Sequence, residues 1–576
     1  MIRPAAVMAG YVAGAFALFW RLWADVDRRY LVDGGSDQNQ WEWFFAVTAR
    51  SVARQDDLLF TTLQNHPDGV NLMANTVMLG LSVPLTPVTL TFGAPVTWAL
   101  VLTFGLAGTA AGWYRFVRRH LNGSRTAAGV AGGFCAFAPP MVSHANAHPN
   151  FVVLFVIPFI VGRLVRLARD RRTLRDGAVL GLLGAYQIYI GEEPLLLTAI
   201  GVGVFAVAYA VLRPRVAYAV AGRLAGGLGI AVLVFAPLVA YPLHHQFFGR
   251  QSYDGLIHGP WGNDLLQLTA FARQSLAGHI AEPGPLAASP TEQNAFFGLP
   301  LVVLVAMLLV WLRRLVVVQA LAVVIAAAVL LSLGPEIMLN GRPTGWSGPW
   351  LWASRLPLLE SVVESRLTMI CVPAIGLLLA LGADRAGSLT AALPPASRRW
   401  AGAACCAVLA EALLPISPKP LAAEDRPETP RFITEGTWRR YVGEGRTLVP
   451  VPPPNGGEST ALRWQVQAGF GFNLPEGYFV GPYGPEREGV YGAPPRPTSI
   501  LLRRARDHND VPAVGKTQRA ELQADLAYWR ADAVVLGPHR RQDVLYETLV
   551  LLLGPGRFED GAWVWDVRPL TRETAR

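Results

Sequence analysis

The residues best suited to chemistry in this chain are two carboxylates that follow its first hydrophobic run. Asp33 and Asp37 lie in the stretch VDGGSDQ, in which Gly34 and Gly35 permit a sharp backbone turn. A carboxylate held there can act as a general base towards a sugar hydroxyl. It can equally serve as a helix N-cap that accepts hydrogen bonds from the amides of the next turn. The spacing alone leaves both interpretations open.

A second acidic pair, Glu192 and Glu193, occurs in the turn IGEEP. The apolar run before it, 177–191, spans only about 22 to 24 Å as a helix, which is less than the ~30 Å hydrocarbon layer. Recessed carboxylates usually face a cavity and tend to be functional. They are also hard ligands suited to a divalent cation such as Mg²⁺ or Ca²⁺. The alternative is a tight turn among lipid headgroups.

Two histidines, His144 and His148, stand four residues apart in SHANAHPN. That spacing can place both imidazoles on one helix face, where they suit a metal or a phosphate. Pro149 and the neighbouring asparagines favour a loop instead. Because a zinc site normally has three or four protein ligands, two histidines alone are a weak metal signal. We therefore expect phosphate binding or hydrogen bonding more than metal binding.

Basic and amide side chains complete the set of candidates. Arg355 and Arg366 flank LPLLESVVES, and arginine there can hold a phosphate through two parallel hydrogen bonds or anchor the loop to anionic headgroups. Asn71 lies in NHPDGVNLMANT, which is either a wall of an outer pocket or ordinary turn chemistry.

The composition indicates where these residues must lie. The chain has 576 residues, of which 52% are hydrophobic and 16% charged, against about 25% charged in soluble proteins. The net charge of +9 comes from short basic patches between apolar runs, which is typical of a membrane protein and not of a nucleic-acid-binding face. The four cysteines all fall inside apolar runs, so neither a disulfide framework nor a zinc site is indicated.

Apolar runs long enough to cross the bilayer recur as far as residue 415, and they predict about eleven transmembrane helices. They lie at 5–23, 95–117, 127–142, 151–165, 177–191, 195–212, 224–243, 297–312, 315–333, 369–381 and 400–414. With the N-terminus inside, every arginine-rich connection is cytoplasmic. This requires that the run 77–92 does not cross, as Pro84 and Pro87 favour. All candidate residues then lie on the outer face.

The predicted fold is mainly α, with two parts. Residues 1–415 form a polytopic membrane domain with a long first outer loop at 25–94, and a proline-rich linker follows at 416–430. Residues 431–576 are predicted to be a small extracytoplasmic α/β domain. Its strands are expected in GRTLVPVP, ADAVVLGP and AWVWDV, and its helices in QRAELQADLAYW and DVLYETLVLLLG.

The segment after Asp37, QNQWEWFFAVTARSVAR, has the spacing of an amphipathic helix. Trp41, Phe44, Phe45 and Val52 share its apolar side. We expect these residues to anchor the helix in the membrane interface and so to hold Asp37 at the surface.

Several of these motifs together resemble those of a group of actinobacterial membrane proteins. They are the aspartate after the first helix, HPDGVNLMANT, IGEEP, the loop SLGPEI…GRPTGW and the outer C-terminal domain. Those proteins look like the GT-C class of glycosyltransferases, which use polyprenyl-phosphate sugars. The resemblance implies a multi-helix enzyme of the plasma membrane with its catalytic carboxylate in the first outer loop.

On this resemblance, Asp37 is the general base, Asp33 is the second choice, and Asp56 and Asp57 are the third. Arg366, with His144 or His148, would stabilise the departing phosphate. The donor would be a polyprenyl-phosphate sugar and the acceptor a cell-envelope glycan, lipid or protein. Transfer by direct displacement would invert the anomeric centre.

Two other classes of protein remain open. A lipid or polysaccharide transporter would need polar residues through the bilayer midplane, whereas here they collect on one face. A non-catalytic scaffold for envelope assembly is the third interpretation, because a fold alone does not fix a function.

Overall fold

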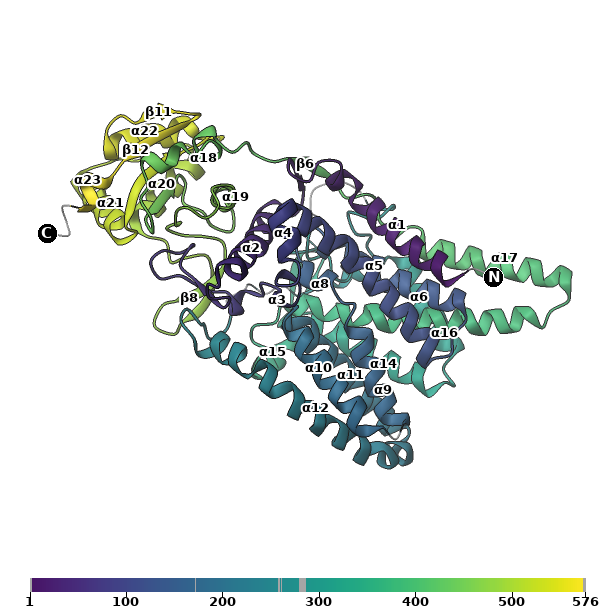
Figure 1. Cartoon of the computed structure of the whole chain (residues 1–576). Helices are drawn as coiled ribbons and strands as arrows, with labels where there is room; N and C mark the ends of the chain where they lie inside the picture. Colours follow the sequence, from purple (N-terminus) through teal and green to yellow (C-terminus); the bar gives the residue numbers. More distant parts are fainter. Residues whose placement is uncertain (1–2, 171, 257–258, 260–261, 279–285, 573–576) are drawn as a thin grey trace.

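The computed structural model describes residues 3–170, 172–256, 259, 262–278 and 286–572. Arg171, in the arginine-rich connection after the apolar run 151–165, and parts of the connection between the runs 224–243 and 297–312 lie outside the described residues. Figure 1 shows a body of long helices with a smaller part, built around a sheet, at one end. The chain is thus mainly helical.

Five helices in the described part are long and apolar enough to cross a membrane. They are α1 (Pro4–Trp23), α5 (Ala94–His120), α11 (Glu192–Leu212), α12 (Pro214–Phe248), and α16 (Cys371–Ala391) together with η3 (Glu364–Ile370). Shorter helices complete the body: α6 (Arg125–Phe137), α9 (Ile157–Arg169), α10 (Thr173–Ile188), α13 (Leu299–Trp311), α14 (Val316–Ser332) and α17 (Pro395–Leu413). The length and apolar composition of these helices are those of an integral membrane protein. The number of eleven crossings stays a prediction.

Prolines break three of the apolar runs. As expected, 77–92 is not one helix but two short ones, α3 (Leu79–Ser82) and α4 (Thr86–Phe92). The single helices expected at 127–142 and 151–165 were wrong. The first ends at Phe137 and is followed by α7 (Pro139–His144), and α8 (Pro149–Val152) is separate from α9. Proline lacks the N–H donor that a continuous helix needs.

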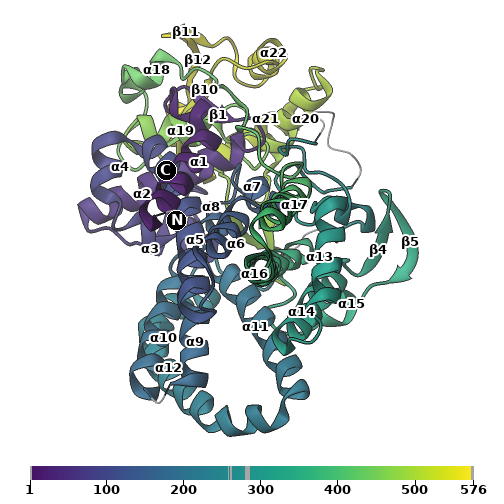
Figure 2. The same ribbon diagram turned by 90° about the vertical axis from the view of Figure 1, so that its right-hand side faces the viewer.

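Small residues allow close packing between the helices of the body. Helices α9, α10 and α12 all pack against one another, and Figure 2 shows them as one group. A Cβ added at Gly181 would stand 2.4 Å from the carbonyl oxygen of Ala231, and one at Gly177 would stand 2.6 Å from that of Gly227. Only glycine permits this approach, which is typical of helix pairs in membranes.

The first outer loop contains α2 (Gly35–Arg54), followed by β2 (Phe60–Thr61), β3 (Val70–Asn71) and η1 (Met73–Asn75). The predicted helix after Asp37 is present, but its expected place at the lipid surface was wrong. Trp41, Phe44 and Phe45 are buried inside the protein, because α2 packs between α4 and α5 on one side and α19 (Thr460–Gln467) on the other. An apolar helix face looks the same in sequence whether lipid or protein covers it.

The C-terminal part contains a four-stranded sheet in the order β11-β12-β10-β7. Strand β10 (Ala531–Leu536) is buried throughout; it runs parallel to β7 (Thr447–Pro450) and antiparallel to β12 (Ala562–Asp566), which pairs with β11 (Arg557–Glu559). Around it lie α18 (Arg431–Thr434), η4 (Thr437–Arg440), α20 (Pro497–His508), α21 (Lys516–Tyr528), α22 (Gln542–Leu553) and α23 (Arg568–Arg572). The strands and helices predicted here from local patterns are all present.

Two β-hairpins and a 3-10 turn lie in the loops of the helical body and of the C-terminal part. Strands β4 (Glu336–Leu339) and β5 (Arg342–Ser347) precede the short helix α15 (Trp350–Ala353), and η2 (Leu265–Leu268) lies in the loop after α12. Strands β8 (Val480–Tyr483) and β9 (Glu488–Tyr491) form a hairpin that reaches from the C-terminal part towards the helical body. This hairpin contributes to the site described below.

The predicted linker is ordered and is built into the outer loop. Its strand β6 (Ala423–Asp425) pairs antiparallel with β1 (Arg29–Leu31), just after α1. Arg426 then donates two hydrogen bonds to the carboxylate of Glu42 on α2, at 2.6 and 2.7 Å, and both side chains are buried. The linker therefore joins the start of the C-terminal part to the first outer loop twice, through the β1–β6 pairing and through the Arg426–Glu42 ion pair.

Candidate active site

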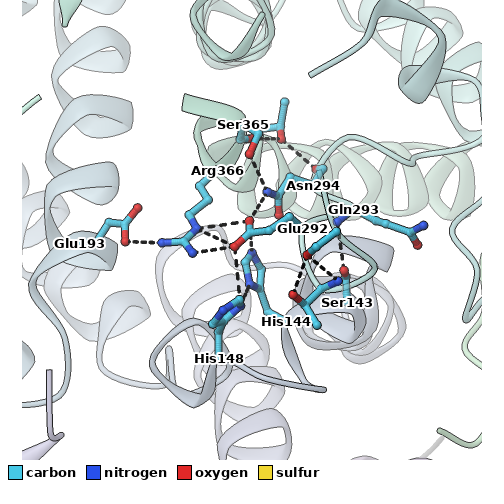
Figure 3. A network of polar contacts seen from close by, with 12 residues as sticks. Ser143, His144, His148, Glu193, Glu292, Gln293, Asn294, Ser365 and Arg366 are labelled. Carbon is cyan, nitrogen blue, oxygen red and sulfur yellow. Dashed lines mark hydrogen bonds and ion pairs between the residues drawn. The ribbon is translucent and has the colours of Figure 1, made fainter. Parts of the chain in front are cut away.

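Arg366, on η3, is the centre of a network of ion pairs (Figure 3). Its Nη1 donates to Glu193 Oε2 at 2.7 Å and its Nη2 donates to Glu292 Oε1 at 2.6 Å. Its Nε lies 3.2 and 3.3 Å from the two Glu292 oxygens, and its guanidinium lies 4.9 Å from the centre of the Phe151 ring. Contacts to described residues thus use three of the five N–H groups of this side chain.

Glu292, in the loop before α13, receives most of this network. Besides Arg366, it accepts a 2.8 Å hydrogen bond from Asn294 Nδ2. Burial on its own would raise the pKa of this carboxyl, but the charge and hydrogen bond of Arg366 together with the two histidines outweigh burial and hold the pKa well below its usual range. Glu292 is consequently a carboxylate at neutral pH, paired with a buried cation.

The two predicted histidines lie against this carboxylate. His144 ends α7 and His148 precedes α8, and their Nδ1 atoms are 2.9 Å apart. His144 Nε2 lies 3.9 Å and His148 Nδ1 lies 3.7 Å from oxygens of Glu292. Burial lowers the pKa of each to about 4, so both imidazoles are neutral at pH 7. The proline-induced break after α6 is what brings them to this position.

Asp37 lies in the first turn of α2, close to the same network. Its Oδ1 accepts a 2.6 Å hydrogen bond from the hydroxyl of Tyr478, which comes from the C-terminal part. Its charge is near enough to act on His148 and on Tyr491, and the charges of Arg366 and Glu292 act on Tyr491 as well. Asp37 thus lies within electrostatic range of His148, and the Arg366 network joins His148 to Glu193 and Glu292.

Other predicted residues have different surroundings. Asp33 Oδ1 accepts from Arg273 Nη1 and its Oδ2 from Gln274 Nε2, both at 2.9 Å. Asn71 is buried and donates to the carbonyl oxygen of His245 at 2.9 Å, which joins the first outer loop to the end of α12. Arg355 is exposed in the loop after α15 and is not among the residues of the network.

The third-ranked carboxylates also have local partners. Asp56 forms a 2.7 Å ion pair with Arg50, and Asp57 accepts from the backbone N–H of Leu59 at 2.8 Å. Both interactions hold the turn after α2.

The acidic pair that was expected to act together is divided. Glu193 points to Arg366, whereas Glu192 lies beside Thr76, whose hydroxyl is 3.5 Å from Glu192 Oε2. Glu192 also borders a small cavity of about 10 Å³, which it shares with Met73, Val77 and Tyr189. That is about the volume needed for one water molecule.

A different group of residues has the geometry to hold a cation. One ligand atom from each of His144, His148 and Glu292 lies within 4.8 Å of the others. Two neutral imidazoles and one carboxylate are the donor set of a borderline metal such as Zn²⁺, more than of Mg²⁺ or Ca²⁺. In this structure Arg366 already neutralises Glu292, so a cation would have to compete with the guanidinium.

Sequence reasoning missed two residues of the site, Glu292 and Tyr478. Glu292 is a carboxylate just before a short apolar helix, whereas Glu192 and Glu193 were singled out by the short apolar run before them, so the proximity of a carboxylate to an apolar run was the available signal. Tyr478 offered no local signal, because nothing in its neighbourhood points to a residue 441 positions earlier.

Comparison with solved structures identifies the fold. Arabinofuranosyltransferase AftD from mycobacteria superposes with a TM-score of 0.59 at 14% identity, covering 98% of this chain and 39% of AftD. An oligosaccharyltransferase of Archaeoglobus fulgidus, tethered to an acceptor peptide, gives 0.51 at 11% identity, covering 99% of this chain and 72% of that one. The same enzyme in a complex with Zn and sulfate gives 0.51 at 12% identity, covering 95% and 70%.

These likenesses show a GT-C-like fold, as the resemblance in sequence implied. The chain spans well under half the length of AftD. No family model and no curated protein sequence matches it. The fold is shared with membrane glycosyltransferases, and activity has to be argued from the site.

Proposed function

We propose that this protein is an integral membrane glycosyltransferase that moves a sugar from a polyprenyl-phosphate donor to an acceptor of the cell envelope. The observation that carries the proposal is that Asp37, in a GT-C-like fold, lies close enough for its charge to act on His148, which borders the Arg366–Glu292 ion pair. A base and a phosphate-binding cation are the two groups that direct displacement at an anomeric carbon requires.

In the proposed reaction, an acceptor hydroxyl attacks the anomeric carbon and its proton passes to the Asp37 carboxylate. The bond between that carbon and the phosphate oxygen breaks, and polyprenyl phosphate leaves with the electron pair. The two Arg366 N–H groups not used by carboxylates can donate to that phosphate, with His148 nearby. A single displacement inverts the configuration.

The proposed location follows from the arrangement of the chain. The N-terminus and the arginine-rich connections would lie in the cytoplasm, while the site and the C-terminal part would lie outside the plasma membrane. No nucleotide sugar is present there, so a lipid-linked donor would supply both the sugar and the leaving group.

The proposal is tested by incubating the purified full-length chain with polyprenyl-phosphate sugars and measuring release of free polyprenyl phosphate. The panel includes an arabinofuranose donor, because AftD is an arabinofuranosyltransferase, and hexose donors. Solubilised envelope glycans, lipids and proteins serve as acceptors. Release that depends on an acceptor supports transfer. A chain that moves labelled lipid across vesicles without releasing phosphate would instead be a transporter.

The helical body offers a place for the donor's lipid tail. A groove of about 670 Å³ between α11 and α14 is lined by Gly203, Val204, Val207, Val211, Gln319 and Val323. Glu193, which binds Arg366, is on the same helix, and Gly203 follows it by about 15 Å of helical rise. Ile370, from the element that carries Arg366, packs on Gly201 at the start of this groove. An isoprenoid tail would extend from the phosphate along this path.

Filling the groove is expected to discriminate donors by tail length. Val207→Trp should raise KM several-fold for a long-chain polyprenyl donor, because the indole removes volume that the tail would occupy, and leave KM unchanged for a short-chain analogue. Val232→Trp, on an exposed face of α12, is the matched control. Equal KM changes for both tail lengths would argue against a tail in this groove.

A divalent cation is proposed for His144, His148 and Glu292, in preference to Glu192 and Glu193 alone. Its charge would add to that of Arg366 opposite the donor phosphate. Zn²⁺ or Mn²⁺ should raise the Tm of the purified protein, and His148→Ala should abolish that rise. Metal analysis after exhaustive dialysis measures the stoichiometry. No Tm shift and no retained metal would remove the cation from the proposal.

A further inference from the structure

We propose that Tyr478 is a positioning residue that orients the Asp37 carboxylate for proton removal, so that the C-terminal part completes the catalytic site. This inference rests on the proposed function of Asp37. The direct observation is the 2.6 Å hydrogen bond from the Tyr478 hydroxyl to Asp37 Oδ1. Among the described residues, no hydrogen bond is made to Oδ2. One oxygen is thereby fixed, and the other is left for the acceptor hydroxyl.

The backbone of Tyr478 is held on both sides by the segment that carries Asp37. Its N–H donates to Gln64 Oε1 at 3.0 Å, and its carbonyl oxygen accepts from Gln40 Nε2 at 3.0 Å. Gln40 is one turn after Asp37 on α2. The tyrosine ring is consequently fixed relative to the carboxylate by three hydrogen bonds, two of which do not involve the hydroxyl.

The hairpin that follows Tyr478 is fixed as well. Asn75 Oδ1 accepts from the N–H of Val480 at 2.6 Å, and Asn75 Nδ2 donates to its carbonyl oxygen at 2.9 Å. At the far end of the hairpin, the N–H of Gly489 donates to the carbonyl oxygen of Gly255 at 2.6 Å. The hairpin therefore holds Tyr478 in one position instead of acting as a mobile lid, which is what precise positioning of a base requires.

The hydroxyl of Tyr478 stays protonated at neutral pH and remains a hydrogen-bond donor. Burial raises its pKa, and the negative charge of Asp37 raises it further, well above the usual range of a tyrosine. The phenol therefore cannot lose its proton at neutral pH. It therefore donates to the carboxylate and occupies Oδ1.

The chain provides a matched control for this contact. Tyr528, on α21, also donates its hydroxyl to an aspartate of the first outer loop, Asp68, and thus joins the same two parts of the protein. That contact is exposed and does not involve the network around Arg366. Tyr478→Phe and Tyr528→Phe therefore each remove one tyrosine to aspartate hydrogen bond between the same parts, but only one of them touches the proposed base.

The test measures donor turnover as polyprenyl phosphate release with the most active polyprenyl-phosphate sugar of the panel. Tyr478→Phe is expected to lower kcat about 10- to 100-fold, since it removes a hydrogen bond to a charged group, with little change in KM for donor or acceptor. Tyr528→Phe should retain the wild-type kcat. In an Asp37→Asn background, Tyr478→Phe should cause no further loss, because the positioned base is already gone.

The outcomes separate this inference from the proposed function. Wild-type kcat in Tyr478→Phe, with Asp37→Asn inactive, would overturn the positioning role and leave the proposed function standing. Additive losses in the double variant would also overturn it, as they would indicate a general structural effect. Full activity of Asp37→Asn, or no turnover of any donor by the wild-type chain, would overturn the proposed function and with it this role. Thermal unfolding of all four variants shows whether each is folded.

Discussion

Asp37→Asn is expected to abolish sugar transfer while the protein remains folded. Removal of a general base typically costs about 10²- to 10⁴-fold in rate. The asparagine amide has nearly the same shape, and its oxygen can still accept the hydrogen bond from Tyr478. The fold should therefore be retained, so that a loss of transfer reports on the missing carboxylate.

Asp33→Asn is the control that distinguishes the two candidate bases. Both oxygens of Asp33 are occupied by Arg273 and Gln274, so this carboxylate has a structural partner for each oxygen. Its substitution should lower the Tm and leave kcat within a few-fold of the wild type. If Asp33→Asn were inactive and Asp37→Asn active, the two roles would be reversed.

Arg366→Met is expected to cause the largest loss of stability and also to abolish transfer. It removes the cation between Glu193 and Glu292 and leaves Glu292 as a buried carboxylate without its main partner. Breaking a buried pair in this way costs about 3 to 5 kcal/mol. Arg440→Met removes an ion pair with Glu559 in which the arginine side chain is 74% exposed, and it should cost at most about 1 kcal/mol.

The loss in Arg366→Met should depend on pH. Without the arginine, burial raises the folded-state pKa of Glu292 above its unfolded value, so the folded carboxyl binds its proton more tightly. Stability is then greatest below the unfolded pKa and falls as the pH rises through the folded pKa. Thermal unfolding of the variant should show a smaller deficit at pH 5 than at pH 8. A further change, Glu292→Gln, should restore part of the Tm but not transfer. If the loss of stability in Arg366→Met did not vary with pH, the unpaired Glu292 carboxylate would not be its cause.

Local patterns were sufficient for much of the fold. Prolines 84 and 87 correctly predicted the break in the run 77–92, and alternating or helical spacing located β7, β10, β12, α21 and α22. These features depend on residues close in sequence. The position of α2 could not be found in this way, because it packs against α19, where the buried Trp43 donates to Gln465 more than 400 residues later in the chain.

The site was found only in part for the same reason. Asp37, Arg366 and the histidines stood out because charged or polar residues are rare beside apolar runs. Sequence did not indicate that Arg366 is held between Glu193 and Glu292, since this pairing joins three segments that are far apart in the chain. Nor could it indicate that a tyrosine of the C-terminal part contacts Asp37. Such contacts are determined by tertiary packing and leave no periodicity.

The 441-residue separation of Asp37 and Tyr478 also determines when during synthesis the site can form. At a translation rate of 5 to 20 residues per second, roughly 20 to 90 s pass between the synthesis of the two residues. During this interval α2 lacks α19, the β8–β9 hairpin and Arg426, which all come later in the chain. A nascent or truncated chain therefore cannot assemble the site, and transfer would begin only after the C-terminal part has been translocated and has docked.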